Sequence, residues 1–281
     1  MRRALISDIH GNLEALDAVL TDIAGQRIKE IFCLGDLVAY GPNPCECIDR
    51  VMANCRVTLL GNHDQAVLSD LMRLKGPNDG ATLSTWTQLS ASSAILASTC
   101  SFASSAAAWT WKQLNDPCDR SRNEVRKAFL SHLPCTYEIG PYQFVHGSLR
   151  NPLSEYVFPE DIYNRRKMER LFALVGHYCF HGHTHIPGVT TGSFKYLAPA
   201  DINDEYQLGE EKLMINVGSV GHPRDGDNRA CYVILDDGPN EDVDDSTDED
   251  GMPVRSPGIT YRRVPYDFET TIRKINDRGL S

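Results

Sequence analysis

Acidic, amide and imidazole side chains gather in five short motifs, each following an apolar run that we predict to be a strand. Alternate side chains of an extended chain face the same way, so the imidazoles of His183 and His185 can both face the cluster. A mixed set of oxygen and nitrogen donors suits two divalent metals of intermediate hardness, such as Mn, Fe, Ni, Co or Zn. The five motifs are Asp8-Ile9-His10, Gly35-Asp36, Gly61-Asn62-His63-Asp64, His146-Gly147 and Gly182-His183-Thr184-His185.

The elements that would position these motifs can be read from the apolar pattern. Strands are predicted over residues 4–7, 31–34, 57–60, 144–145 and 214–217. Apolar residues at helical spacing predict helices over 13–23, 44–55 and 268–275, with Asn43-Pro44 and Asp267 as helix starts. Strands alternating with helices predict a layered α/β fold, in which strand-end loops converge at one edge.

Two further segments differ from this pattern. Residues 76–121 are rich in Ala, Ser and Thr, and we expect a helical cover there. Residues 230–235 and 259–265 are expected to pair as strands, so that residues 236–252 form an acidic hairpin loop. The loop contains D-V-D-D-S, but it lacks the glycine of a calcium loop, which favours a solvated loop over an ion site.

Composition and charge exclude several classes of protein. The net charge of −10 argues against general nucleic-acid binding. Nine acidic residues lie within 236–250, and without them 28 basic residues face 29 acidic ones. We find no apolar run of about 18 residues, which would indicate a membrane span. With no signal peptide found, and with nine scattered cysteines that form no CxxC pair, we expect a cytoplasmic protein.

The order of the motifs resembles that of the calcineurin-like metallophosphoesterase superfamily, whose signature is D-x-H, G-D, G-N-H-[DE], a separate H, and G-H-x-H. Outside the metal motifs, stretches 35–44, 145–156, 215–230 and 264–267 resemble the small phosphodiesterase branch of bacteria and archaea. This resemblance implies an α/β fold with a two-sheet β-sandwich core flanked by helices in four layers. It also implies that residues 1–281 form a single domain.

The resemblance also implies roles for individual residues. Asp36 would bridge two divalent transition-metal ions, with manganese favoured. A hydroxide between the ions would attack phosphorus, and His63 would assist the leaving group. The first ion would be held by Asp8, His10, Asp36 and His185, and the second by Asp36, Asn62, His146 and His183.

The expected activity is hydrolysis of a small phosphorylated substrate, by a phosphodiesterase or a phosphatase. The phosphoprotein phosphatases and the symmetrical dinucleoside tetraphosphatases of the superfamily carry GDxVDRG, where this chain has Ala39 and Tyr40 in place of Asp and Arg. A nucleotide or phosphoprotein phosphatase remains an alternative. A non-catalytic protein like the retromer subunit of this fold is a further one, although that subunit has lost the catalytic His. The sequence does not determine the oligomeric state.

Several other polar residues have two interpretations each. Arg224 could bind a substrate phosphate or pair with Asp225 or Asp227. Asp64 could orient His63, which the sequence alone does not decide. His181 is expected to be packed, not to bind metal, and Asn12 to cap a helix.

Overall fold

Two six-stranded sheets form the centre of the computed structural model, which describes residues 1–75, 101–238 and 256–280. The first sheet has the order β3-β2-β1-β11-β12-β9, and the second has the order β4-β5-β6-β10-β7-β8. The strands of the first sheet are β1 (Arg2–Ile6), β2 (Glu30–Cys33), β3 (Val57–Thr58), β9 (Glu205–Gln207), β11 (Ala230–Asp236) and β12 (Gly258–Val264). Those of the second are β4 (Thr136–Ile139), β5 (Tyr142–Val145), β6 (Tyr178–His181), β7 (Gly188–Thr191), β8 (Tyr196–Leu197) and β10 (Leu213–Asn216).

Each sheet contains three neighbouring parallel strands. These are β1, β2 and β3 in the first sheet, and β5, β6 and β10 in the second. The remaining pairs are antiparallel, including β11 with β12. Because parallel strands end at the same edge of a sheet, the loops that follow them lie together.

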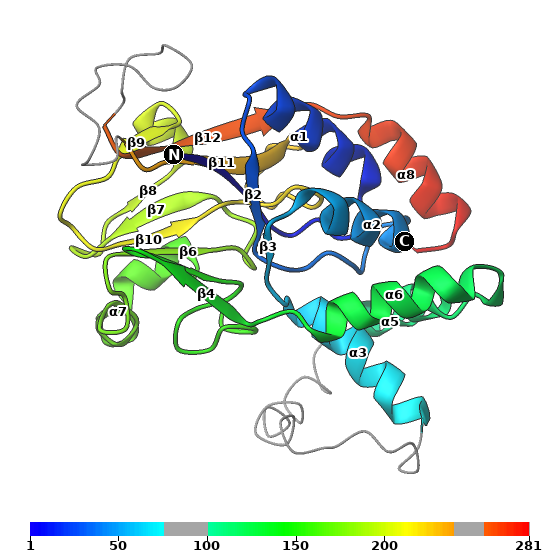
Figure 1. The fold of residues 1–281 in the computed structure, drawn as a ribbon. Helices are drawn as coiled ribbons and strands as arrows, with labels where there is room; N and C mark the ends of the chain where they lie inside the picture. The colour runs from blue at the N-terminus through cyan, green and yellow to red at the C-terminus, as the bar shows by residue number, and fades with distance from the viewer. Residues whose placement is uncertain (76–100, 239–255, 281) are drawn as a thin grey trace.

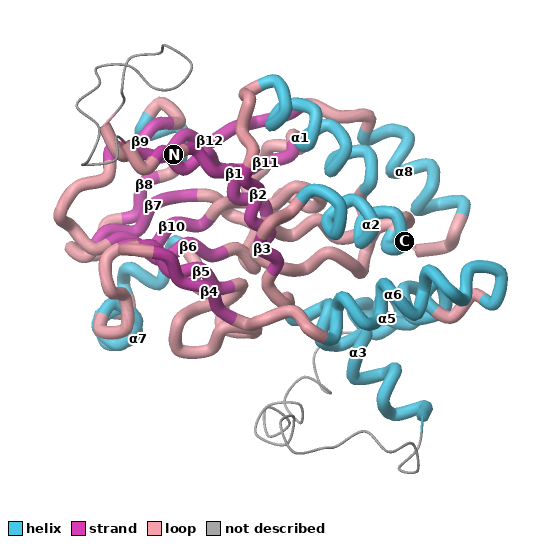
Figure 2. Tube along the Cα trace, in the orientation of Figure 1, coloured by secondary structure: helices cyan, strands magenta, loops and turns pink. Residues whose placement is uncertain are grey.

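Helices cover the outer faces of both sheets (Figures 1 and 2). Helices α1, α2 and α8 lie over the first sheet, and α7 lies beyond the second. Helices α3, α5 and α6 pack together beside α2. The helices are α1 (Leu13–Gly25), α2 (Pro44–Asn54), α3 (Asn62–Lys75), α5 (Ser101–Leu114), α6 (Arg120–Ser131), α7 (Arg165–Phe172) and α8 (Phe268–Asp277). Short 3-10 turns are η2 (Pro117–Asp119), η3 (Pro159–Tyr163) and η4 (Pro199–Ile202).

The core is divided among the layers by the alternation of strand side chains. In β1, Leu5 packs between the sheets, whereas Ala4 and Ile6 face the helices. In β6, Phe180 packs between the sheets and Cys179 faces α7. A period of two therefore buries both faces of the central strands, which explains why these strands are almost entirely apolar. The expected two-sheet core flanked by helices is confirmed.

The helix starts follow the expected capping chemistry in part. Asn12 accepts a hydrogen bond from the Ala15 amide, and Asp267 accepts one from Thr270. Asn43 precedes Pro44 at the start of α2, but its side chain makes no capping bond and instead accepts one from Lys274. This bond ties the start of α2 to α8.

The two unusual segments lie partly outside the described residues. Residues 101–121 of the expected helical cover form α5, η2 and the start of α6, whereas 76–100 lie outside. The expected pairing of the strands at 230–235 and 259–265 is confirmed by β11 and β12. The acidic loop was expected to begin at residue 236, but Asp236 ends β11 and pairs in register with Arg2, while Asp237 pairs with Arg3. Residues 239–255 lie outside the described part. None of the described helices is long and apolar enough to cross a membrane.

Candidate metal centre

The predicted site residues lie in loops that leave the parallel strands. Asp8 and His10 follow β1, Asp36 follows β2, and Asn62 and His63 begin α3 after β3. His146 follows β5, and His183 and His185 follow β6. The first sheet therefore contributes the carboxylates, the amide and two imidazoles, and the second sheet contributes the other three imidazoles.

The loops hold these side chains in an uncommon backbone conformation. Asp8, His10, Asp36, His183 and His185 all have positive φ angles, between 50° and 67°. Asp and His tolerate this region better than most residues, and such strain concentrates at functional sites. Backbone hydrogen bonds join the loops, for example from the amide of His10 to the carbonyl of Asp36 at 3.0 Å.

Two glycines allow the loops to approach one another. A Cβ atom on Gly61 would overlap the backbone nitrogen and Oδ1 atom of Asp36. A Cβ atom on Gly182 would overlap Ser7 and the Oδ2 atom of Asp8. Only glycine fits at these two places without displacing a carboxylate.

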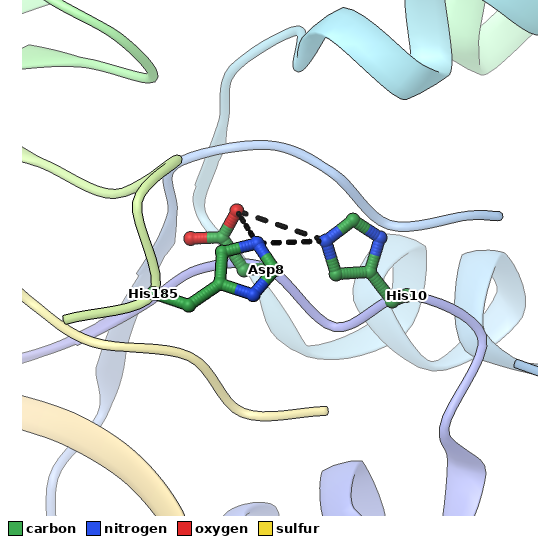
Figure 3. A group of neighbouring side chains, drawn as sticks. All are labelled: Asp8, His10 and His185. Carbon is green, nitrogen blue, oxygen red and sulfur yellow. Dashed lines mark hydrogen bonds and ion pairs between the residues drawn. The ribbon is translucent and has the colours of Figure 1, made fainter. Parts of the chain in front are cut away.

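The first group of donors consists of Asp8, His10 and His185 (Figure 3). The Nδ1 atoms of both imidazoles face backbone carbonyls, that of His10 at 3.1 Å from Val38 and that of His185 at 2.6 Å from His222. A carbonyl only accepts, so each Nδ1 carries a hydrogen. The Nε2 atoms of His10 and His185 then face each other at 3.1 Å. The Oδ1 atom of Asp8 lies 3.3 Å from the Nε2 atom of His185.

The second group consists of Asp36, His146 and His183. The Nδ1 atom of His146 lies 3.0 Å from the carbonyl of Leu34, which fixes its tautomer in the same way. Its Nε2 atom then lies 3.1 Å from His183 Nδ1 and 3.3 Å from Asp36 Oδ2. The Oδ1 atom of Asn62 lies 3.0 Å from the same Nε2 atom.

Asp36 lies between the two groups. Its Oδ2 atom is 3.3 Å from His146 Nε2 and 3.7 Å from His10 Nε2. This oxygen and Asp8 Oδ1 are buried and make no hydrogen bond within the described residues. Buried polar atoms are nearly always satisfied, so two carboxylate oxygens that face imidazole nitrogens without a hydrogen bond suit the coordination of a cation.

The charges of the site agree with this interpretation. Burial by itself would raise the pKa of Asp36, but His146 and His63 hold it well below its ordinary value. Burial alone would lower the pKa of His146, but Asp36 raises it to about 9. Ionised carboxylates therefore raise the pKa of His146, whereas burial lowers the pKa of His10 and brings the pKa of His183 to about 3. The oxygen and nitrogen donors of the site fit divalent transition metals.

His63 lies beside the two groups at the start of α3. Its backbone amide donates to Asp36 Oδ1 at 2.9 Å. Its imidazole contacts the rings of His10 and Tyr40 edge-on, with centroids 5.1 and 4.9 Å apart. Burial lowers the pKa of His63 below its ordinary value, while Asp36 opposes this effect.

Asp64 orients the loops and not His63. Its carboxylate accepts hydrogen bonds from the amides of Asp36, Leu37, Val38 and Gly61, at 2.9–3.3 Å. The side chain thus ties the loop after β2 to the start of α3. The His63 ring is contacted by the rings of His10 and Tyr40.

Arg224 and His181, which each had two interpretations in the sequence, have clear surroundings in the structure. Arg224 is exposed, and its amide donates to the carbonyl of His185. Asp225 pairs with Arg263 and Asp227 with Arg229, so neither forms the salt bridge considered for Arg224. His181 is buried in β6 next to Asn216, outside both groups of donors.

Three further rings lie around the site, in addition to the expected ligands and His63. Tyr40 and His222 lie over His10, with ring centroids 4.8 and 6.1 Å from it. The Tyr156 ring stacks on the His183 ring, with centroids 3.9 Å apart. Tyr40, Tyr156 and His222 all fall in stretches that carried the family resemblance, but no spacing rule predicts that their rings meet the site.

Comparison with known proteins agrees with the fold. The sequence profile of the "Calcineurin-like phosphoesterase superfamily domain" matches residues 1–238. The chain therefore belongs to the calcineurin-like phosphoesterase superfamily.

Among its relatives, the uncharacterized protein MJ0912 of Methanocaldococcus jannaschii is 36% identical, over 97% of this chain and 90% of that protein. The crystal structure of a metallophosphoesterase from Sphaerobacter thermophilus superposes with a TM-score of 0.69 and 31% identity, over 100% of this chain and 95% of its own. A symmetrical bis(5'-nucleosyl)-tetraphosphatase of Actinobacillus pleuropneumoniae is 34% identical over 84 residues, which are 28% of this chain and 31% of that protein.

Proposed function

We propose that this protein hydrolyses small phosphate esters with two divalent metal ions, as a phosphodiesterase or a phosphomonoesterase. One observation carries the proposal: two groups of buried donors converge on either side of Asp36, and two of their carboxylate oxygens are unpaired. Asp8, His10, Asp36 and His185 would hold one ion, and Asp36, Asn62, His146 and His183 the other. When bound, such ions activate water and neutralise phosphate charge.

The chain's own residues would do the remaining work. The backbone carbonyls of Val38, Leu34 and His222 hold three imidazoles with Nε2 directed into the site. His63 would donate a proton to the departing oxygen, since an anionic phosphate next to it raises its pKa. Arg224, in the loop after β10, would bind a phosphate oxygen. Asp225 and Asp227, the two aspartates considered as its partners, pair with Arg263 and Arg229 instead.

The site argues against a non-catalytic role, because all seven expected ligands and His63 lie together. The local likeness to a tetraphosphatase supports the testing of nucleotides, although Ala39 and Tyr40 replace the Asp and Arg of that pattern. A panel of phosphate mono- and diesters and dinucleoside polyphosphates would separate these activities. We expect Mn²⁺ to be the most effective ion and the protein to act in the cytoplasm.

The test uses bis-p-nitrophenyl phosphate and p-nitrophenyl phosphate with Mn²⁺. His63→Ala should lower kcat by about 10²–10⁴-fold while the metal content stays at the wild-type level. Asp36→Ala should lose both metal and activity. His132→Ala is the matched control, because this residue caps the C-terminal end of α6 and its imidazole, within the described residues, bonds only to Ser131 and Ala128. A metal-loaded protein that hydrolyses no ester of the panel, or His63→Ala with unchanged turnover, would exclude the proposal.

A further inference from the structure

A cleft of about 160 Å³ opens beside the candidate metal centre. Its inner wall contains His10, Tyr40 and His222, from the loops after β1, β2 and β10. Its outer wall contains Ile275 of α8 and Leu280, which follows that helix. The cleft therefore joins the site to the C-terminal part of the chain.

The polar groups at the floor of the cleft are already satisfied within the protein. The side-chain amide of Asn12 donates to the carbonyl of Gly221, and its oxygen accepts from Ala15 and Thr271. The Thr271 hydroxyl also lies 3.0 Å from Glu14. A ligand group in the cleft thus meets apolar atoms and ring faces, with few free polar partners.

The inner end of the cleft adjoins His63. The rings of His10 and Tyr40 line the cleft and also contact the His63 ring, with centroids 5.1 and 4.9 Å from it. An ester group whose oxygen reaches His63 would therefore extend along these rings towards Ile275.

Tyr40 is held in this place by its backbone. Ala39 and Tyr40 both have positive φ angles, 73° and 58°, which non-glycine residues seldom adopt. The resulting position puts the Tyr40 ring 5.2 Å from that of His222 and 4.8 Å from that of His10. Aromatic rings pair edge-on or with an offset stack, so the rings of Tyr40 and His222 offer surfaces on which a flat ring can pack.

The size of the cleft limits what it can hold. An apolar cavity of about 150 Å³ engineered into another protein binds benzene. We infer that the cleft binds a single aromatic ring carried on the ester oxygen of the substrate. This inference rests on the proposed hydrolysis, and it narrows the substrate class to esters of compact aryl alcohols.

A cavity-filling variant tests the inference. Ile275→Trp should fill the cleft, and Ile272→Trp is the matched control, because Ile272 lies on the same helix, is 51% exposed and does not line the cleft. Phenol and inorganic phosphate serve as competing inhibitors of bis-p-nitrophenyl phosphate hydrolysis. Ile275→Trp should weaken inhibition by phenol about tenfold or more, while inhibition by phosphate changes less than about twofold. The control should match the wild type for both inhibitors.

A second measurement needs no activity. Titration of metal-free protein with phenol, followed by NMR, should show saturable binding in the wild type and the Ile272→Trp control but not in Ile275→Trp. If Ile275→Trp does not fold, Ile275→Phe replaces it, and this variant should also weaken phenol binding. Phenol binding no better than glycerol, or equal in wild type and Ile275→Trp, overturns the inference. Absence of hydrolysis with intact phenol binding instead overturns the proposed function alone.

Discussion

Left-handed backbone at five of the donor residues is a cost that the surrounding structure must offset. Each such position costs about 1–3 kcal/mol, so the loops persist only because other contacts fix them. The Asp64 carboxylate, with its four backbone amides, and the carbonyls that bond His10, His146 and His185 provide those contacts. These contacts hold the donors in place.

The close approach of Gly61 to Asp36 gives a prediction at the scale of one residue. Gly61→Ala should displace Asp36, because the new Cβ atom overlaps its backbone nitrogen and Oδ1. We expect a loss of bound metal and a free energy of unfolding lower by about 1–3 kcal/mol. Metal analysis and urea denaturation measure the two effects.

Gly25→Ala is the matched control for that substitution. Gly25 ends α1, and an added Cβ atom there meets nothing within 4 Å. This control should keep both the metal content and the stability of the wild type. Equal metal content in Gly61→Ala would show that the approach of the two loops is not what places Asp36.

Polar contacts between elements join the helices to one another and to the sheet. Arg126 of α6 is buried and forms a two-pronged ion pair with Asp49 of α2, at 2.8 and 2.5 Å. It also bonds Asp119 at 2.7 Å. In the first sheet, Arg262 of β12 and Tyr232 of β11 both bond Asp22 of α1.

Removal of the Arg126 side chain should separate α2 from α6. Arg126→Ala leaves two carboxylates without their partner, and we expect a loss of about 1–3 kcal/mol, less than for a fully buried pair because Asp49 is partly exposed. Thermal and urea denaturation measure this loss. Arg50→Ala is the control, since its ion pair with Asp17 is exposed on both sides, and should cost at most about 1 kcal/mol. Equal effects of the two substitutions would contradict the prediction.

The Asp22 contacts predict a pH dependence of stability. Burial would raise the pKa of Asp22, but hydrogen bonds from Arg262 and Tyr232 outweigh it and lower that pKa below the ordinary 3.8. A lowered pKa in the folded state contributes stability above the unfolded value, and this contribution is lost as the pH falls through the folded value. Asp22→Asn should therefore destabilise the protein at pH 7, and the difference from the wild type should shrink below about pH 4. Urea denaturation at several pH values measures it, and a constant difference would count against this account.

At the scale of the whole molecule, the candidate metal centre lies where the two sheets meet. Each proposed ion takes ligands from both sheets: Asp8 and His10 with His185, and Asn62 with His146 and His183. Bound metal would therefore connect the two sheets. The described part of the chain shows no other cluster of histidines and carboxylates that could do so.

Metal addition should consequently stabilise the whole fold. At a free-metal concentration 100 times the Kd, one site contributes about 2.7 kcal/mol. For a chain of this size, this should raise the Tm by about 5–10 °C, measured by calorimetry of metal-free protein with and without Mn²⁺. Asp36→Asn should remove the shift. An unchanged Tm with two ions bound would contradict a connection between the sheets.

The sequence by itself predicted the layered α/β fold and the strands that lead to Asp8, Asp36, Asn62 and His146, because apolar runs are local properties of the chain. No predicted strand range covered β6, which leads to His183. The order of the motifs, through its resemblance to a family, implied the two-sheet core and the roles of the eight residues expected to bind metal or act in catalysis. The roles of Asp64, Tyr40, Tyr156 and His222 depended on loops that are distant in sequence but meet in space. Which carbonyl fixes each imidazole was decided only by the tertiary structure, because these contacts join loops that lie 28, 112 and 37 positions apart. The cleft between Tyr40 and Ile275 likewise exists only because α8 packs beside the loops after β1, β2 and β10.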